Sequence, residues 1–422
     1  MVSPQRTGEA EVAQSLSAET PLLPFSAVKF LIRSFLILSS LFFSMNIAVN
    51  TRQLQGDDAK GRADLILNCF SFLAKKYPQH KFIYLFDQTY DQKLITSENI
   101  IPVVAGPEAK NPLRLQYWFN YKVPAVLKKY KATIFVSLDG ICSLRTKVPQ
   151  CLLVNDLSFI HYPQFYSKSM LRFYKKFIPG FLAKAKVIAT TAESLKEELV
   201  KQYKVDGENI RLVYRPPGPA FQPIDEKEKE SIKAKYTEGR EYFLYAGSID
   251  AGKNLINLLK AFSFFKKRQK SSMQLVIAGK AVSGFTQFAR DLGTFKFRNE
   301  VKWLEDLSAD ELEKIMAGAY AMVYPVFVEH QNAVVMQAMQ CEVPVIASPG
   351  VNLPDSCTKA VLYVTPGDFM DIADKMMLLF KDEDSRNQLI SLGKASTQKI
   401  DIAKSANMLW QCIEASIKYE TA

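Results

Sequence analysis

Short apolar runs alternate with amphipathic stretches along most of the chain, and the alternation begins at Met45. The runs are rich in β-branched and aromatic residues and mostly apolar throughout, which is typical of strands buried on both faces of a parallel sheet. The stretches between them repeat apolar residues every three or four positions, as amphipathic helices do. In the first half we expect strands at 45–52, 82–86, 133–137, 151–154, 186–190 and 211–214, and helices at 61–77, 165–185 and 191–203.

A Pro-rich break at Arg215–Pro219 and a charged segment at Asp225–Lys235 interrupt this pattern, which then starts again. The second series predicts strands at 242–246, 274–278, 320–324 and 343–347, and helices at 254–270 and 333–340. Two such series predict an α/β protein with two Rossmann-like domains whose parallel sheets face each other across a cleft, where such folds bind ligands. We expect an N-terminal domain at 45–222, a linker at 223–240, a C-terminal domain at 241–400 and a C-terminal helix at 401–422 that packs back on the N-terminal domain.

The positive charge of the chain is concentrated in the first of these domains. The net charge is +11, and residues 45–225 hold 26 Lys and Arg against 15 Asp and Glu, whereas residues 226–422 hold 25 of each. Such an excess favours anionic lipid headgroups or phosphorylated substrates as partners. Nucleic acid ranks third, because no RNA- or DNA-binding motif accompanies the charge, and we expect no nucleic-acid partner.

The composition excludes several classes of protein. Hydrophobic residues make up 48% of the chain and aromatic residues 12%, which excludes a disordered or low-complexity protein. The six Cys form no C-x-x-C pair and only three His are present, so we expect no metal site and no disulfide scaffold. This cysteine usage fits a reducing compartment, and we expect a cytoplasmic protein.

Residues 1–44 differ from the rest of the chain. A polar, acidic start precedes an apolar stretch at 25–43, which Lys29 and Arg33 interrupt. The uncharged part is shorter than the ~20 residues that span a bilayer, and no small-residue cleavage site of a signal peptide follows it. Two interpretations stay open: Met45 is the true start of the native protein, or 25–43 is an anchor at the membrane interface.

Two segments are expected to point a helix N-terminus at the cleft. The first runs from Tyr242 to Asn254 as strand, Gly-containing loop and helix start, and includes Lys253. The unpaired N–H groups and dipole of a helix N-terminus suit a diphosphate, and the lysine adds a full charge. This segment matches neither a P-loop nor G-x-G-x-x-G, and taken alone it is more often only a tight connection. The second segment is the loop 329–332, which leads into a short buried helix at 333–340.

From Met45 onward the chain resembles the family 4 glycosyltransferases of the GT-B fold, retaining bacterial enzymes of glycan and polysaccharide biosynthesis that use nucleotide sugars. The resemblance covers residues 45–418, and its segments agree with the family in order and in spacing. These segments are Leu138–Pro149, Asn155–Pro163, Gly247 with Lys253 and Asn254, Glu329 to Val345, Leu353–Asp355 and Val361–Val364.

This resemblance implies retaining transfer of a sugar from a nucleotide-sugar donor to a glycan or lipid-linked glycan acceptor. The nucleotide sugar is then a co-substrate, and neither a metal nor a cofactor is needed. The donor is expected in the C-terminal domain, with its phosphates on Lys253, its sugar hydroxyls on Glu329 and its ribose on Gln337. The implied catalytic residues are Asn155, Asp156 and Glu329, and the implied donor-binding residues are Gly247, Ser248, Lys253, Asn254, His330, Gln331, Asn332 and Gln337.

The donor-site motif departs from the pattern of the family it resembles. That family carries a Glu, a Gly-containing loop and a second Glu eight positions after the first, whereas this chain has Glu329, the loop His330–Asn332 and Gln337. An amide in place of the second carboxylate is expected to weaken the ribose contact by ~1–2 kcal/mol. The family also has an Arg shortly before the lysine, where this chain has Ser248 and Gly252.

The N-terminal half of the motif departs as well, since Asn155 stands where the family has His, and the loop 56–61 keeps only two glycines of its pattern. Losses confined to the donor site suggest an altered donor site on an intact fold. The alternative function is a catalytically impaired paralogue that binds a glycan or a partner protein. A nucleotide-sugar epimerase of related fold fits the order of the segments less well.

The acceptor side of the resemblance falls on the basic domain. Its stretch Lys168–Ile178 mixes basic and aromatic residues at helical spacing, which is typical of a helix on a membrane surface. It is equally typical of a solvated helix with an ordinary buried face. In the first interpretation the N-terminal domain binds anionic lipid, and the protein is peripheral at the inner face of the membrane, near a lipid-linked acceptor.

Overall fold

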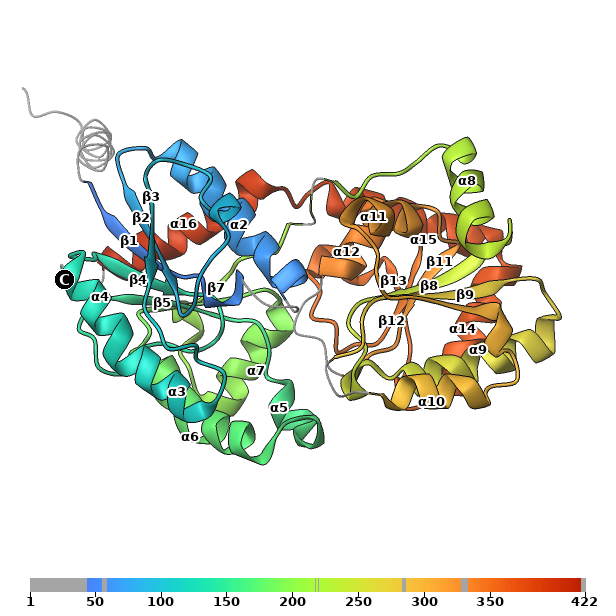
Figure 1. Cartoon of the computed structure of the whole chain (residues 1–422), viewed down its shortest axis with the longest axis horizontal. Coiled ribbons are helices and arrows are strands. Elements are labelled where there is room, and N and C mark those ends of the chain that lie inside the picture. Colours follow the sequence, from blue (N-terminus) through green and yellow to red (C-terminus); the bar gives the residue numbers. More distant parts are fainter. Residues whose placement is uncertain are drawn as a thin grey trace, which may run out of the picture. The chain divides into compact units, whose positions relative to one another are not determined.

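A computed structural model describes residues 44–54, 59–216, 218, 220–282, 286–327 and 333–418, with side chains for all of these except 59–66. The apolar segment 25–43, and with it both interpretations of the first 44 residues, lies outside the described residues. Within them, two parallel sheets with helices on their faces make up the fold (Figure 1). The predicted α/β fold class is therefore confirmed.

The first sheet has seven strands in the order β3-β2-β1-β4-β5-β6-β7, and each neighbouring pair is parallel. The strands are β1 (Asn46–Asn50), β2 (Lys81–Phe86), β3 (Ile100–Val104), β4 (Ile134–Ser137), β5 (Gln150–Val154), β6 (Val187–Thr190) and β7 (Ile210–Leu212). The main helices of this domain are α2 (Ala59–Lys76), α3 (Pro112–Tyr117), α4 (Val123–Lys129), α5 (Ser158–His161), α6 (Lys168–Lys184) and α7 (Glu193–Tyr203).

The second sheet has six strands in the order β10-β9-β8-β11-β12-β13, again all parallel. They are β8 (Tyr242–Ala246), β9 (Gln274–Ala278), β10 (Val301–Leu304), β11 (Ala321–Tyr324), β12 (Val345–Ala347) and β13 (Val361–Tyr363). The accompanying helices are α8 (Glu226–Thr237), α9 (Leu255–Gln269), α10 (Gln287–Thr294), α11 (Ala309–Ala317), α12 (Ala333–Gln340), α13 (Asp355–Thr358), α14 (Phe369–Lys381) and α15 (Glu383–Thr397).

The first sheet is buried on both faces, because its strands alternate between two apolar cores. Ile47 and Val49 of β1 belong to a core that α2 closes, whereas Ala48 belongs to a core under α3, α4, α6 and α7. This is why the strands read as continuous apolar runs in the sequence. Figure 1 shows the two sets of helices on opposite faces of the sheet.

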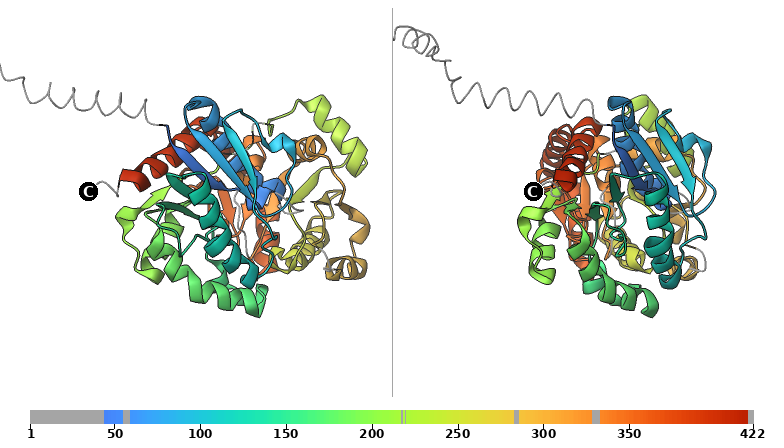
Figure 2. Two further views of the ribbon diagram at one scale, coloured as in Figure 1. Left: turned by 60° about the vertical axis from the view of Figure 1, so that its left-hand side comes forward. Right: turned by 90° about the vertical axis from the view of Figure 1, so that its left-hand side faces the viewer.

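The helix α16 (Ile402–Lys418) follows the second sheet in the chain but completes the core of the first. Its Leu409 and Ile413 are buried in the core that α2 closes, and Figures 1 and 2 show α16 beside α2. The Trp410 ring stacks on Tyr77 at a centroid distance of 4.1 Å and on His80 at 5.3 Å. The chain therefore passes twice between the sheets, once after β7 and once between α15 and α16.

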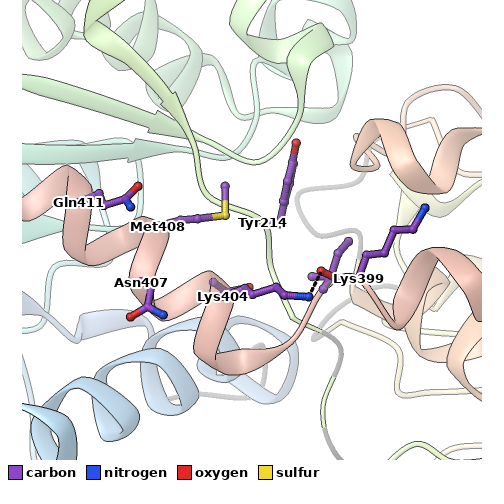
Figure 3. Close-up of a pocket in the computed structure, with 8 residues that line it drawn as sticks. Tyr214, Lys399, Lys404, Asn407, Met408 and Gln411 are labelled. Atoms are coloured by element: carbon purple, nitrogen blue, oxygen red, sulfur yellow. Dashed lines mark hydrogen bonds between the residues drawn. The ribbon is translucent and has the colours of Figure 1, made fainter.

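A cavity of about 350 Å³ lies where these two passages meet (Figure 3). Tyr214 comes from the first passage, and the other lining residues come from the second passage and from α16. They are Lys399, Ile400, Lys404, Ser405, Asn407, Met408 and Gln411. In the wall of this cavity, Nζ of Lys404 donates to the backbone oxygen of Lys399 at 3.2 Å.

Several elements differ from the sequence-based expectation. The segment expected to be a linker contains α8, because Asp225 caps its N-terminus and Lys233 is buried in ion pairs with Glu230 and Glu241. The strands β3, β10 and β13 were not predicted. All three are edge strands with one neighbour each and contain partly exposed residues, although β3 and β13 are apolar throughout.

Candidate functional site

The loop after β8 is held by a close contact between two glycines. Gly247 and Gly279 have φ angles of +149° and +154°, and the N–H of Gly247 donates to the oxygen of Ala278 at 3.0 Å. A Cβ atom on Gly279 would lie 1.9 Å from the oxygen of Gly247. Only glycine fits at such an approach. The carboxyl ends of β8 and β9 are therefore fixed against each other.

The predicted phosphate-binding segment forms a short 3-10 helix, η6 (Ala251–Lys253), between β8 and α9. Asp250 caps it by accepting from the backbone N–H of Gly252 at 2.8 Å, and Ser248 Oγ donates to the same carboxylate at 3.3 Å. Lys253 is buried immediately before the start of α9. The site therefore has a lysine at a helix N-terminus, as the sequence predicts.

The next residue, Asn254, connects three loops at the carboxyl edge of the second sheet. Its φ of +59° is left-handed, and its Nδ2 donates to the backbone oxygens of Pro325 at 2.7 Å and Pro366 at 2.5 Å. Its Oδ1 accepts from Nδ2 of Asn257 at 2.8 Å. Both amide hydrogens are thus used within the protein, and Asn254 acts on the site by positioning the loops after β8, β11 and β13.

Only part of the second predicted segment belongs to the described residues. Glu329, His330, Gln331 and Asn332 lie outside the described residues. Gln337 is buried on α12, in the second turn of that helix. The loop that leads to these residues is fixed at its start, because the N–H of Phe327 donates to the oxygen of Gly252 at 2.9 Å. The structure therefore brings Phe327 directly to η6.

The same Phe327 connects this segment to the first domain. Its ring stacks on Phe165 at a centroid distance of 5.7 Å and lies 5.9 Å from the ring of Tyr162. Both partners follow α5, the short helix that begins two residues after Asp156. The turn after α5 in the first domain and Gly252 in the second therefore meet at Phe327.

Asp156 has a well-defined local role at the carboxyl end of β5. It accepts from the N–H and the Oγ of Ser158, both at 2.8 Å, and from the hydroxyl of Tyr166 at 3.3 Å. Burial and this carboxylate together raise the pKa of Tyr166 far above its ordinary value. Asp156 therefore shapes the turn into α5, and the phenol beside it stays protonated.

Asn155 and His161 lie in different surroundings. Nδ2 of Asn155 donates to the backbone oxygen of Leu138 at 3.0 Å, and its Oδ1 is buried with no partner among the described residues. His161 instead pairs with Glu198 at 2.6 Å and is half exposed. Asn155 thus presents an unused acceptor at the carboxyl edge of the first sheet, whereas His161 forms an ion pair at the surface.

A polar cluster at this edge was missed by the sequence analysis. Arg52 follows β1 and pairs with the buried carboxylate of Asp139, which follows β4, at 2.8 Å. Asn50 Nδ2 donates to Ser137 Oγ at 3.0 Å, and burial raises the pKa of nearby Asp87 after β2. The available signal was that each of these polar residues ends or follows a strand, and that parallel strands end at the same edge.

A comparison with known protein families decides the class of this site. Residues 226–396 match the family model described as glycosyl transferases group 1. The matched residues include the whole η6–α9 segment and α12. This match lies in the second half of the chain and confirms the predicted resemblance to glycosyltransferases over these residues. It supports a transferase.

Relatives and solved structures agree with this glycosyltransferase assignment. The chain is 27% identical over 289 residues to O-antigen chain mannosyltransferase RfbU of Salmonella typhimurium, a match to 66% of this chain and 75% of that protein. It is 23% identical over 253 residues to O-antigen chain mannosyltransferase B of Escherichia coli, covering 58% of this chain and 65% of that protein. The structure of Anabaena HepE in complex with UDP and glucose matches 88% of this chain and all of that chain, with a TM-score of 0.69 and 11% identity. This last likeness confirms the GT-B fold.

The described residues contain neither a cluster suited to a metal ion nor a helix suited to spanning a membrane. Among the described residues, no group of three or more His, Cys, Asp and Glu side chains is arranged to hold a metal ion. Within the same residues, no helix combines the length and the apolar character that crossing a bilayer requires.

Proposed function

We propose that the enzyme transfers a mannosyl residue from a nucleotide sugar to a growing, lipid-linked glycan, with retention of the anomeric configuration. The observation that carries this proposal is the match over 289 residues to a named O-antigen chain mannosyltransferase, together with a second match to another. The contact of Phe327 with Gly252 and with the rings of Tyr162 and Phe165 supports a reaction between the two domains.

The donor phosphates would lie at η6 and the start of α9. The departing nucleoside diphosphate gains negative charge as the sugar bond breaks, and a helix N-terminus with a buried lysine stabilises such charge without reorganisation. Lys253 would supply the full charge and the first N–H groups of α9 the partial charge. Glu329 and Gln337 would bind the sugar and the ribose, and Asn155 would offer its buried Oδ1 to a donor or acceptor hydroxyl.

The test is transfer from a labelled nucleotide sugar to lipid-linked acceptor extracted from membranes, with the linkage of the product read by NMR. The GDP and UDP conjugates of mannose, glucose and galactose are compared. Mannose transfer with an α product from an α donor supports the proposal, and transfer of another sugar or inversion of the anomeric centre refutes it. Lys253→Gln should lower kcat by about two to three decades, as loss of one charge-stabilising donor does.

A second candidate is a binding protein whose donor site has decayed. It is favoured by Ser248 and Gln337, which replace a cation and a carboxylate of the family pattern. Ser248 is partly exposed and can accept a longer side chain, whereas Gly252 is buried and cannot. Measurable transfer by the native protein refutes decay; transfer that appears only in the double variant Ser248→Arg with Gln337→Glu establishes it.

The acceptor would bind to the N-terminal domain, and a lipid-linked acceptor would bring this domain to the cytoplasmic membrane face. The helix α6 contains the stretch that was expected to contact lipid. Its aromatic residues are used in the core, however: Phe173 and Phe181 are buried, and Phe177 stacks between them. Its exposed residues are mainly cations and include no large apolar side chain, so α6 supplies charge for such a surface but no apolar anchor.

A further inference from the structure

The face of the N-terminal domain beside α6 carries exposed apolar side chains that the core does not need. Leu113, Tyr117 and Tyr121 are 80%, 44% and 51% exposed, at a spacing of four residues along α3 and the turn that follows it. The buried stripe of the same segment, which includes Trp118 and Phe119, already packs under the sheet. We call Leu113, Tyr117 and Tyr121 the Tyr117 surface.

A π-helical turn, η3 (Trp118–Lys122), gives this surface its shape. The N–H of Val123 donates to the oxygen of Trp118, five residues earlier, so the turn is wider than in an α-helix. Tyr121 stacks on Tyr117 at a centroid distance of 5.6 Å, and the Nζ of Lys122 lies 5.8 Å from the same ring. The wide turn therefore places an aromatic ring and a cation together against Tyr117.

A second cation completes the arrangement. The guanidinium carbon of Arg145 lies 4.2 Å from the centre of the Tyr121 ring, and Arg145 is exposed. Both tyrosine rings thus carry a cation on one side while remaining accessible. Rings and cations at one level are typical of side chains that sit at the boundary between lipid headgroups and acyl chains.

The charge around the Tyr117 surface is mostly positive. Residues 109–138 contain six Lys and Arg and no Asp or Glu, and residues 157–192 contain another six with no acid. These ranges hold α3, η3, α4 and α6, which cover the same face of the first sheet (Figure 1), and α3 contacts α6. Arg172, Lys175 and Lys176 of α6 are exposed beside it.

We propose that the Tyr117 surface docks on an anionic phospholipid bilayer, with Leu113, Tyr117 and Tyr121 in the headgroup boundary and the cations of η3 and α6 on lipid phosphates. Charge complementarity selects this occupant, because the excess of cations on α3, η3, α4 and α6 attracts anionic headgroups and repels a second copy of the same surface. The inference is independent of the sugar that the enzyme transfers.

The test uses the full chain and vesicles of phosphatidylcholine alone or with a quarter of phosphatidylglycerol, pelleted by centrifugation. The native protein should bind the anionic vesicles and lose binding when salt rises from about 0.1 to about 0.5 M. The triple variant L113S/Y117S/Y121S should bind roughly thirty-fold more weakly, at about three-fold for each half-buried side chain. The variant K122Q/R145Q should lose about five-fold per cation.

A matched control replaces exposed apolar side chains elsewhere. Val200, Met370 and Leu378 are similarly exposed on α7 and α14, so V200S/M370S/L378S should bind as the native protein does. Native-like binding by L113S/Y117S/Y121S overturns the proposal and leaves residues 25–43 as the anchor. A native dimer that this variant dissolves, seen by light scattering without vesicles, also overturns it, because a second copy then covers the surface.

Discussion

Replacing Asn254 by alanine tests whether this residue builds the donor site or contacts the donor. Its side chain makes three hydrogen bonds, two to the oxygens of Pro325 and Pro366 and one from Asn257. The carbonyl groups lie in loops that follow two different strands. The variant Asn254→Ala removes all three bonds and keeps a left-handed backbone without the side chain that tolerates it.

The expected cost follows from these contacts. Each lost hydrogen bond contributes about 1 kcal/mol, and a left-handed alanine costs about 1 kcal/mol more. The sum is about 4 kcal/mol, which lowers Tm by about 8–16 °C in a domain of this size. Asn254→Gly removes the same bonds without the backbone strain, so its loss should be about 3 kcal/mol.

Scanning calorimetry of the purified full chain measures both variants. The control is Asn387→Ala on the exposed face of α15, where the change should stay within about 0.5 kcal/mol. A Tm within about 2 °C of the native value for Asn254→Ala would refute the reasoning. An unchanged Tm with a raised KM for the nucleotide sugar in Asn254→Gly would instead show that the amide contacts the donor.

Two further predictions concern the scaffold. Gly279→Ala should lower Tm by more than 10 °C or prevent soluble expression, because the new Cβ meets the Gly247 oxygen at 1.9 Å; Gly293→Ala, where the Cβ meets open space within α10, should raise stability by about 0.5–1 kcal/mol. A similar Tm for the two variants would contradict the close approach at Gly279. Burial lowers the pKa of His80 below its ordinary value of 6.5, so the unfolded chain takes up this proton first as the pH falls. The stability contributed by neutral His80 is therefore complete above pH 6.5 and is lost as the pH falls towards the lower folded-state pKa. Urea unfolding at pH 7.5 and 5.5 should show a smaller difference in the free energy of unfolding in His80→Gln than in the native protein, and an equal difference in the two proteins would rule out this role.

The parts of the fold that the sequence predicted are those with strong local patterns. β8 is a run of five apolar residues and β9 has four after Gln274, and their buried residues leave little choice but a central parallel strand. β3 and β10 have one neighbour each and partly exposed residues, so pairing decides them rather than composition. α8 is rich in charged residues and is held by the ion pairs of Lys233. A pattern of apolar residues does not reveal such a helix.

The residues of the candidate site likewise divide into those that a local sequence pattern predicts and those that depend on contacts between distant segments. Lys253 was predicted from its position before a helix, which is a local property. The pairing of Arg52 with Asp139 joins residues 87 positions apart and depends on β1 and β4 being neighbours. Asn254 was expected to bind the donor, but a left-handed Asn directly before a helix is also a signal for a positioning role. An Asn directly before a helix could have been noticed in the sequence. Its hydrogen-bond partners at 325 and 366 could not have been predicted, because they are distant in the chain.

The position of α16 also has a consequence for how the protein is made. A ribosome releases the strands of the first sheet long before residues 402–418, so the core between α2 and that sheet lacks Leu409 and Ile413 while the second domain is being synthesised. Until then Trp410 is missing from its stack on Tyr77 and His80, and the apolar surface left open is available to chaperones. The first domain therefore cannot complete its core until α16 has been synthesised.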